Sequence, residues 1–183
     1  FTVTSPAGLV YDGEAKCATV SSTKINENYI HVEYEDANGN LDQATKAGTY
    51  KVLVTAKGNP NYNEVNQLKD SAWTFTIQKA KPVIQLTAAT QTLVKNDKEV
   101  DISGWASFNN TDSGAELTYM LVDEPEGITL SADNKLTAAS GTTTTGFDIQ
   151  ITATATDNFE APAAATIHVA VVEKQDAGVS ITG

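Results

Sequence analysis

The chain has 183 residues, a formal net charge of -11 and an isoelectric point near 4.4. All 12 of its basic residues are lysines, so it has neither the clustered cations nor the bidentate guanidinium groups with which proteins hold phosphate and nucleic acid. Composition therefore excludes nucleic acid as a partner, and the chain has no run of about 18 apolar residues that would predict insertion into a membrane.

Cys17 is the single cysteine of the chain, which excludes an intrachain disulfide. It alternates with Lys16 and Ala18 in a strand-like run, and no neighbouring residue supplies a base that would activate its thiol. We therefore expect Cys17 to be a small buried core residue.

A break at Lys79-Ala80-Lys81-Pro82 divides the chain into two β-patterned parts. Residues 73–78 alternate apolar and polar side chains before the break, and Pro82 removes a backbone donor at the start of a new strand after it. We expect domains at residues 1–80 and 81–175, followed at 176–183 by a linker or the start of a further module. That ending predicts that the chain is a piece of a longer protein.

The first domain shows alternating strand patterns separated by turn signals. We expect strands at residues 29–34, 50–56 and 71–78. Asn38-Gly39 predicts a tight turn, because both residues tolerate positive φ. Trp73 shares a face with Phe75 and Ile77, which places it in the core. The polar segment 62–70 has room for a single helical turn, and no long helix is expected.

The second domain repeats short strand patterns with Gly, Asn or Asp between them. We expect strands at residues 82–87, 99–102, 117–122, 127–130, 135–137, 147–153 and 166–171. No crossover helices for a parallel sheet are present in the pattern. The predicted fold class is all-β, with two consecutive small antiparallel β-sandwich (Ig-like) domains. A β-grasp-like variant is the alternative for the first domain.

The first domain resembles the repeated "MBG" module of bacterial surface proteins. The motifs that carry the resemblance are Val10-Tyr11-Asp12-Gly13, Ala47-Gly48-Thr49-Tyr50-Lys51-Val52, Gly58-Asn59-Pro60-Asn61-Tyr62, and Trp73-Thr74-Phe75-Thr76-Ile77 followed by Lys79-Ala80.

Residues 82–173 resemble a bacterial immunoglobulin-like or cadherin-like module. The resemblance rests on Pro125-Glu126-Gly127-Ile128-Thr129-Leu130-Ser131, Lys135-Leu136-Thr137, and Thr152-Ala153-Thr154-Ala155-Thr156-Asp157. Such modules stand in tandem in long surface proteins of bacteria, some of which attach cells to glycans or host surfaces. The resemblance implies an extracellular location, secreted or attached to the cell surface, with neighbouring domains as partners. It supplies no catalytic residues.

Trp105 is the candidate for carbohydrate binding. It follows Gly104 at the end of a short predicted strand, and the amides and carboxylate beside it would bind sugar hydroxyls if the indole stacked on a pyranose; these neighbours are Asn109, Asn110 and Asp112. The alternative is that Trp105 and Phe108 close one end of the sandwich. Tyr29, Tyr62 and Phe159 would contribute to a sugar site if they were exposed.

Three groups of acidic residues are weak candidates for calcium, which takes six to eight oxygen ligands. The first is Asp97, Glu99 and Asp101; the second is Asp123, Glu124 and Glu126; the third is Asp157, Asn158 and Glu160. None has the spacing of an EF-hand loop. Solvated carboxylates are the default in so acidic a chain.

No motif for catalysis is present. The sequence has no Gly-x-Ser-x-Gly, no Cys-His arrangement and no phosphate-cradling loop. His31 and His168 fall on polar-facing positions in different domains, where solvated side chains are expected. Composition leaves a paired-carboxylate glycosidase open, although two domains this small rarely enclose the necessary cleft. We expect no enzyme and no cofactor, and calcium is left open as a weak alternative.

Three functions fit these observations. The first is a non-catalytic pair of modules that acts as a spacer or adhesion scaffold. The alternative is a carbohydrate-binding module that holds polysaccharide or host glycan at Trp105. The third is an adhesion module stiffened by calcium.

Overall fold

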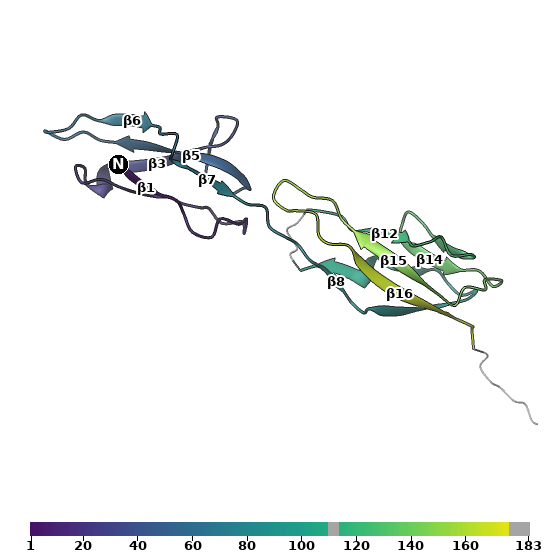
Figure 1. Ribbon diagram of the computed structural model, residues 1–183. Coiled ribbons are helices and arrows are strands. Elements are labelled where there is room, and N and C mark those ends of the chain that lie inside the picture. Colours follow the sequence, from purple (N-terminus) through teal and green to yellow (C-terminus); the bar gives the residue numbers. More distant parts are fainter. Residues whose placement is uncertain (110–113, 176–183) are drawn as a thin grey trace, which may run out of the picture. The chain divides into compact units, whose positions relative to one another are not determined.

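The computed structural model describes residues 1–109 and 114–175. These residues form two compact units (Figure 1). Unit 1 contains Phe1–Lys81 and Thr156–Glu160, and unit 2 contains Pro82–Ala155 and the described residues that follow Glu160. Strands, turns and two single-turn 3-10 helices make up the described part of the chain, which confirms the all-β class. None of the described helices has the length and hydropathy needed to cross a membrane.

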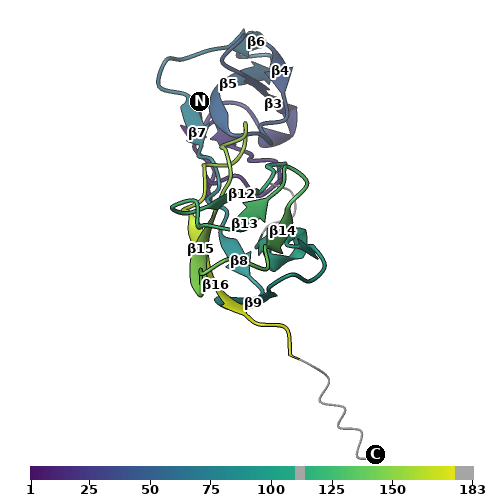
Figure 2. The same ribbon diagram turned by 90° about the vertical axis from the view of Figure 1, so that its right-hand side faces the viewer.

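Unit 1 is built on a five-stranded sheet with a smaller two-stranded sheet beside it. Its elements are β1 (Thr2–Thr4), β2 (Thr19–Ser21), η1 (Glu27–Tyr29), β3 (Ile30–Glu35), β4 (Leu41–Asp42), β5 (Gly48–Ala56), β6 (Val65–Leu68) and β7 (Thr74–Ile77). The larger sheet has the order β4-β3-β5-β6, and β7 pairs with the first half of β5 (Figure 2). β1 pairs with β2. All these pairs are antiparallel.

The core of unit 1 follows from the alternation of β5 and β7. The inward residues of β5 are buried, and their aromatic neighbours on β3 and β7 pack on them; the buried cluster is Ala18, Val20, Tyr34, Ala44, Tyr50, Val52, Val54, Phe75 and Ile77. The ring of Phe75 lies 5.6 Å from that of Tyr34, edge to face, and 5.7 Å from that of Tyr50. Trp73 is partly buried against this cluster, as the sequence predicts.

The expectation for residues 62–70 is wrong in one respect, because this segment contains β6 and no helical turn. β6 is an edge strand in which only Val65 is half-buried, so its composition lacks the apolar alternation that predicts a strand. A bulge interrupts its pairing with β5, and Gln67 has a φ of 46°. The predicted turn at Asn38-Gly39 is confirmed, since Gly39 has a φ of 86°.

The expectation that Cys17 is buried is also wrong. Cys17 is exposed, whereas Lys16 is only 9% exposed. The backbone N–H of Lys16 donates to the carbonyl of Ala44, and its ammonium pairs with Asp12 over 2.5 Å. These bonds satisfy the polar atoms of Lys16 while its alkyl chain faces inward. The alternation therefore has the opposite phase, with Lys16 and Ala18 inward and Cys17 outward.

Glu35 of unit 1 forms ion pairs with two lysines. Glu35 accepts a hydrogen bond from Lys51 over 3.1 Å and pairs with Lys69. The hydrogen bond from Lys69, followed by that from Lys51, holds the pKa of Glu35 below its ordinary value of 4.5. The ionised form of Glu35 is therefore favoured by folding.

Replacing Glu35 by glutamine is expected to cause a small loss of stability at neutral pH. Because the pKa is lowered in the folded state, the contribution is complete above the unfolded pKa near 4.5 and is lost as the pH falls through the folded value. Thermal melting of Glu35→Gln against wild type checks this, with Glu64→Gln as the control for a carboxylate without a described ion pair. Added salt should narrow the difference at neutral pH. An equal difference in strong acid would contradict the assignment.

The segment Thr156–Glu160 completes unit 1. Its backbone pairs with Ala80, which accepts from Glu160 N–H over 2.9 Å and donates to the carbonyl of Asn158 over 2.9 Å. The ring of Phe159 meets the ring of Tyr11 edge to face at 5.2 Å, and Phe159 is 2% exposed. Phe159 is therefore a packing residue, and it has no exposed face to offer a sugar.

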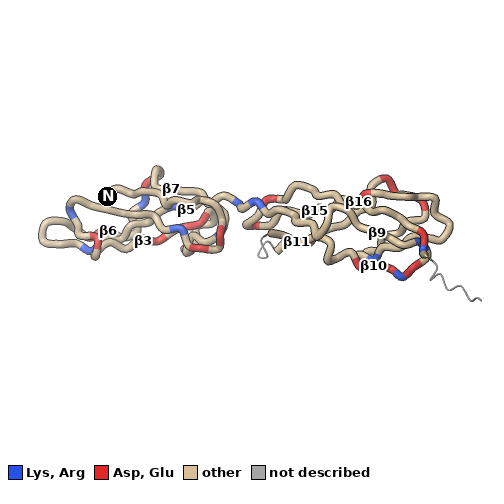
Figure 3. Tube along the Cα trace, turned by 90° about the horizontal axis from the view of Figure 1, so that it is seen from below, with Lys and Arg blue, Asp and Glu red and all other residues tan. Residues whose placement is uncertain are grey.

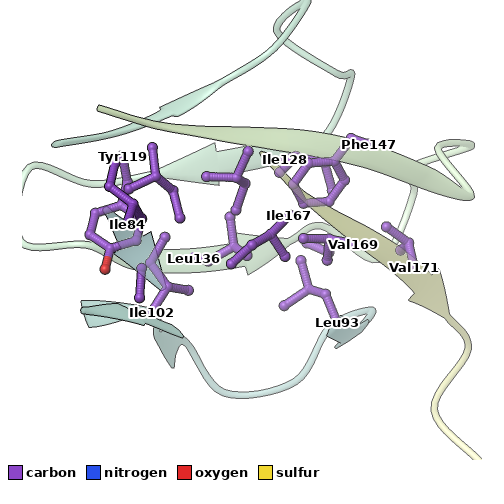
Figure 4. Close-up of a cluster of buried hydrophobic side chains, with 14 residues drawn as sticks. Ile84, Leu93, Ile102, Tyr119, Ile128, Leu136, Phe147, Ile167, Val169 and Val171 are labelled. Carbon is purple, nitrogen blue, oxygen red and sulfur yellow. The ribbon is translucent and has the colours of Figure 1, made fainter. Parts of the chain in front are cut away.

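Unit 2 is a sandwich of two layers. Its elements are β8 (Ile84–Leu86), β9 (Thr90–Val94), β10 (Val100–Asp101), η2 (Ser103–Trp105), β11 (Ala106–Phe108), β12 (Thr118–Leu121), β13 (Ile128–Leu130), β14 (Lys135–Ala138), β15 (Gly146–Thr152) and β16 (Ala165–Val172). One layer is the sheet β12-β15-β16-β9, and the other contains β10-β14-β13 and the pair β11-β8. Buried side chains from both layers meet between them (Figure 4).

Two features of unit 2 differ from the expected pattern. The strands β9 and β11 lie in segments that the sequence does not predict as strands. For β9 the reason is that this edge strand begins with Thr90-Gln91-Thr92 and buries only Leu93 in the core. In addition, β9 pairs with β16 in parallel, from Thr90 opposite His168 to Val94 opposite Val172. Every other strand pair within the described residues of unit 2 is antiparallel.

Candidate functional site

Trp105 lies at the end of η2 and contributes to the core of unit 2. Its side chain is partly buried and packs against the hydrophobic cluster, as does that of Phe108. The backbone N–H of Trp105 donates to the carbonyl of Ile102 over 2.9 Å, and the backbone carbonyl of Trp105 accepts from the N–H of Thr87 over 2.9 Å. The indole therefore takes part in closing the sandwich, which was the alternative to sugar contact.

The amide of Asn109 also has a structural partner. The side-chain Oδ1 of Asn109 accepts from the N–H of Val83 over 2.8 Å, and the backbone N–H of Asn109 donates to the carbonyl of Val83 over 3.0 Å. These two bonds extend the pairing of β11 with β8. Asn110 and Asp112 lie outside the described residues. The carbohydrate site at Trp105 therefore stays a prediction. Of its described residues, Trp105 already packs against the core and Asn109 already bonds to Val83.

Two of the first three calcium candidates pair with lysines. Lys135 donates to Asp101 over 2.6 Å, and Lys174 donates to Asp97 over 3.1 Å. The bond from Lys135, with a further one from the N–H of Ser103, holds the pKa of Asp101 far below its ordinary value. Figure 3 shows basic and acidic positions side by side near β10. Calcium would have to displace these ammonium groups.

The other acidic groups are not brought together either. Asp123 and Glu124 have φ values of 61° and 43° in a tight turn, and Asn158 accepts from the N–H of Ala47 over 3.0 Å. Glu160 pairs with Lys81 over 3.5 Å. Within residues 1–109 and 114–175, no three His, Cys, Asp or Glu side chains converge as metal ligands do.

The two histidines are exposed, and one of them has a partner that the sequence did not indicate. His168 Nδ1 lies 2.8 Å from Asp148 Oδ1, and the two residues are opposite each other on β16 and β15. A Cβ on Gly146 would lie 3.1 Å from the His168 ring, so the glycine makes room for it. Both residues stand at polar positions of their strands, but only the register of the two strands could have paired them.

An open depression of 480 Å³ on unit 1 contains Cys17 and His31, with side chains of β3 and β4 around them. The hydroxyl of Tyr34 in this depression accepts from the N–H of Ala18 over 2.8 Å, and burial raises the pKa of Tyr34. Its hydroxyl is thereby committed to holding residues 17–18 against β3.

No model of a known protein family matches the chain, and no curated protein matches it. Among solved structures, the chain is similar to a human mucin-like protocadherin EC1-2, with 13% identity and a TM-score of 0.35 over 90% of this chain and 94% of that one. It is also similar to human CDH23 EC21-23, with 11% identity and a TM-score of 0.30 over 91% of this chain and 68% of that one. The MBG-type assignment of the first domain stays a prediction.

Proposed function

We propose that the chain is a non-catalytic pair of extracellular modules from a bacterial cell-surface protein, where it acts as a spacer and adhesion scaffold between neighbouring domains. The observation that carries the proposal is the parallel pairing of β9 with β16 in unit 2. The commitment of candidate ligands to internal partners supports it, since Asp97, Asp101 and Asn109 each hold a lysine or a backbone group.

The β9–β16 pair places an early strand of unit 2 beside the last strand among its described residues, and the two strands run in the same direction over five residue pairs. A pull on the two ends of the chain draws β9 and β16 in opposite directions along their common axis. The hydrogen bonds between them are then loaded together, in shear, instead of being opened one after another. A module with this arrangement suits a spacer that has to stay folded under tension.

The position of each N–H on β9 follows from the bonds at the ends of the ladder. Ala89 accepts from the N–H of His168 over 3.1 Å, and Lys95 donates to the carbonyl of Val172 over 2.9 Å. Bonding residues alternate along a parallel strand, so the N–H of Gln91 faces β16 and the N–H of Thr92 faces away. β9 is an edge strand, which leaves the N–H of Thr92 toward solvent.

Gln91→Pro is therefore expected to weaken unit 2 under force, and Thr92→Pro is the matched control. Proline at residue 91 removes a ladder donor and leaves a carbonyl of β16 without its partner, at a cost of about 1–3 kcal/mol. The unfolding rate of unit 2 at constant force should rise about fivefold or more. Proline at residue 92 loses no ladder bond and should leave the rate close to that of wild type.

Single-molecule unfolding of the chain between two handles measures both rates. Wild type should unfold in two discrete steps, one for each unit. A chain that extends smoothly at low force would contradict the scaffold function, and equal rates in the two proline variants would contradict the role of the β9–β16 ladder.

Carbohydrate binding at Trp105 and calcium binding at Asp97, Glu99 and Asp101 are weaker proposals. The first needs an indole that packs against the core of unit 2, and the second needs carboxylates that two lysines already occupy.

A further inference from the structure

Two loops of unit 1 meet at one end of its large sheet. One runs from Ser22 to Tyr29 before β3, and the other runs from Lys57 to Tyr62 after β5. Asn59 joins them, because its Nδ2 donates to the carbonyl of Lys24 over 3.4 Å. The ammonium of Lys24 lies 5.4 Å from the centre of the Tyr62 ring. We call Lys24, Tyr29, Asn59 and Tyr62 the tyrosine tip.

The backbone of the tyrosine tip is fixed by its own hydrogen bonds. Asn59 Oδ1 accepts from the N–H groups of Asn61 and Tyr62 over 2.9 and 3.0 Å, and Asn59 and Tyr62 also exchange two backbone bonds. The backbone N–H of Tyr29 donates to the carbonyl of Asn26, and the backbone carbonyl of Tyr29 accepts from the N–H of Lys57. The surface is thus organised before any partner arrives, which lowers the entropy cost of binding.

Gly58 allows the second loop to fold back closely. A Cβ at this position would lie 2.7 Å from the backbone nitrogen of Glu64 and 2.9 Å from the carbonyl oxygen of Tyr62. The loop can take this path only with a glycine there. The position of Tyr62 therefore depends on a specific backbone packing.

The tyrosine tip exposes two aromatic rings on this fixed backbone. Tyr29 is 59% exposed and Tyr62 is 42% exposed, whereas the tyrosines at the core of unit 1, Tyr34 and Tyr50, are buried. Lys24 also lines an adjoining depression of 360 Å³ with hydroxyl-bearing side chains; its lining is Phe1, Thr2, Ser21, Ser22, Thr23 and Lys24. Lys24 therefore lies both beside the Tyr62 ring and at the edge of a depression lined by hydroxyls.

The chemistry of this surface fits a neutral sugar. A tyrosine ring gives a rigid apolar face at a small loss of rotamer freedom, and the C–H face of a pyranose is the apolar surface that such a ring can cover. Exposed amide and hydroxyl groups can bond the ring hydroxyls. Counted over residues 22–29 and 57–64, the formal charges sum to zero, because Lys24 and Lys57 are equal in number to Glu27 and Glu64. An acidic polymer would gain no net attraction here.

We propose that the tyrosine tip of unit 1 binds a neutral saccharide, by stacking on Tyr29 and Tyr62 and by hydrogen bonds to the surrounding amides and hydroxyls. This site is separate from the one predicted at Trp105, and it would add direct attachment to the scaffold function. If the tyrosine tip binds no saccharide, the scaffold function is unaffected, because the force experiment on unit 2 does not depend on saccharide binding.

Affinity electrophoresis in native gels tests the proposal. The net charge of -11 drives the chain through the gel, and substitutions of tyrosine leave that charge unchanged. The gels contain soluble starch, arabinoxylan, galactomannan or β-glucan, with polygalacturonate as the acidic polymer. At least one neutral polymer should slow the wild-type chain, and the Tyr29→Ala/Tyr62→Ala double variant should bind it about tenfold or more weakly.

Two further variants separate the role of the rings from general effects. Tyr29→Phe/Tyr62→Phe keeps both rings and should keep most of the affinity. Leu41→Ala removes a 57% exposed apolar side chain elsewhere on unit 1 and should change nothing. The proposal is overturned if no neutral polymer slows wild type, if only polygalacturonate does, if the double alanine variant binds as well as wild type, or if the phenylalanine variant loses as much as the alanine variant.

Discussion

Replacing Ile167 by alanine is expected to lower the melting temperature of unit 2 by about 12–24 °C. Ile167 is fully buried on β16, between the two layers of the sandwich and near Leu136 of the opposite layer (Figure 4). Truncating such a residue costs roughly 3 kcal/mol, because the contacts are lost and a cavity remains. In a domain of this size each kcal/mol moves the midpoint by about 4–8 °C.

The two tryptophans allow each unit to be followed separately. Trp73 reports on unit 1 and Trp105 on unit 2, so Ile167→Ala is measured by fluorescence melting in a Trp73→Phe background and again in a Trp105→Phe background. Met120→Ala is the control, since Met120 is 47% exposed on β12 and its loss should stay within about 0.5 kcal/mol. A fall in the midpoint of unit 1 of the same size would contradict separate cores.

Phe159→Ala is expected to destabilise unit 1, although residue 159 is distant in sequence from residues 1–81. Phe159 is 2% exposed and meets the ring of Tyr11, which packs against the core of unit 1. Removing a buried phenylalanine ring costs about 3–5 kcal/mol, which corresponds to a fall of about 12–40 °C in the midpoint of unit 1. The Trp73 signal measures this fall.

The control for Phe159→Ala is Asp157→Ala on the same segment. Asp157 is exposed and should have an effect within about 0.5 kcal/mol. If Phe159→Ala left the Trp73 midpoint unchanged and moved that of Trp105 instead, Thr156–Glu160 would not be part of unit 1.

The strands that could be predicted from sequence are those with one buried face and a long alternation. β5, β15 and β16 are examples, because each offers three or more buried residues in alternate positions. β6 and β9 show no such pattern, because an edge strand buries few of its side chains, and the sequence therefore does not predict them. The parallel direction of β9 cannot be predicted from its own residues either, since register and direction depend on contacts far apart in the chain.

Cys17 shows how an alternation of buried and exposed residues can be assigned the wrong phase, in a segment that precedes β2 and is not itself a strand. Hydrophobicity favours Cys17 over Lys16 for the interior, but Asp12 lies four residues before Lys16 and pairs with its ammonium. A short segment with one apolar and one long amphipathic candidate has two phases of similar cost. Only the position of the partner carboxylate decides between them.

The sequence predicts which residues have the right chemistry for a ligand, but it does not predict which partners they have in the fold. The sequence identifies Trp105, Asn109 and the acidic groups as possible ligands, but their use in packing and in bonds to Val83, Lys135 and Lys174 depends on strand pairing. The sequence also names Tyr29 and Tyr62 as useful if exposed. Their exposure follows from loop conformation around Asn59, which no periodicity encodes.

Native-state hydrogen exchange tests most directly whether the chain is two units that each hold their own core. The slowest amides should lie in β5 of unit 1 and in β15 and β16 of unit 2, because these strands are paired on both sides. Their protection should approach the unfolding free energy of each unit, about 5–15 kcal/mol for a stable domain. Exchange of every β5 amide at the rate of an unfolded chain, while β15 and β16 stay protected, would contradict the account.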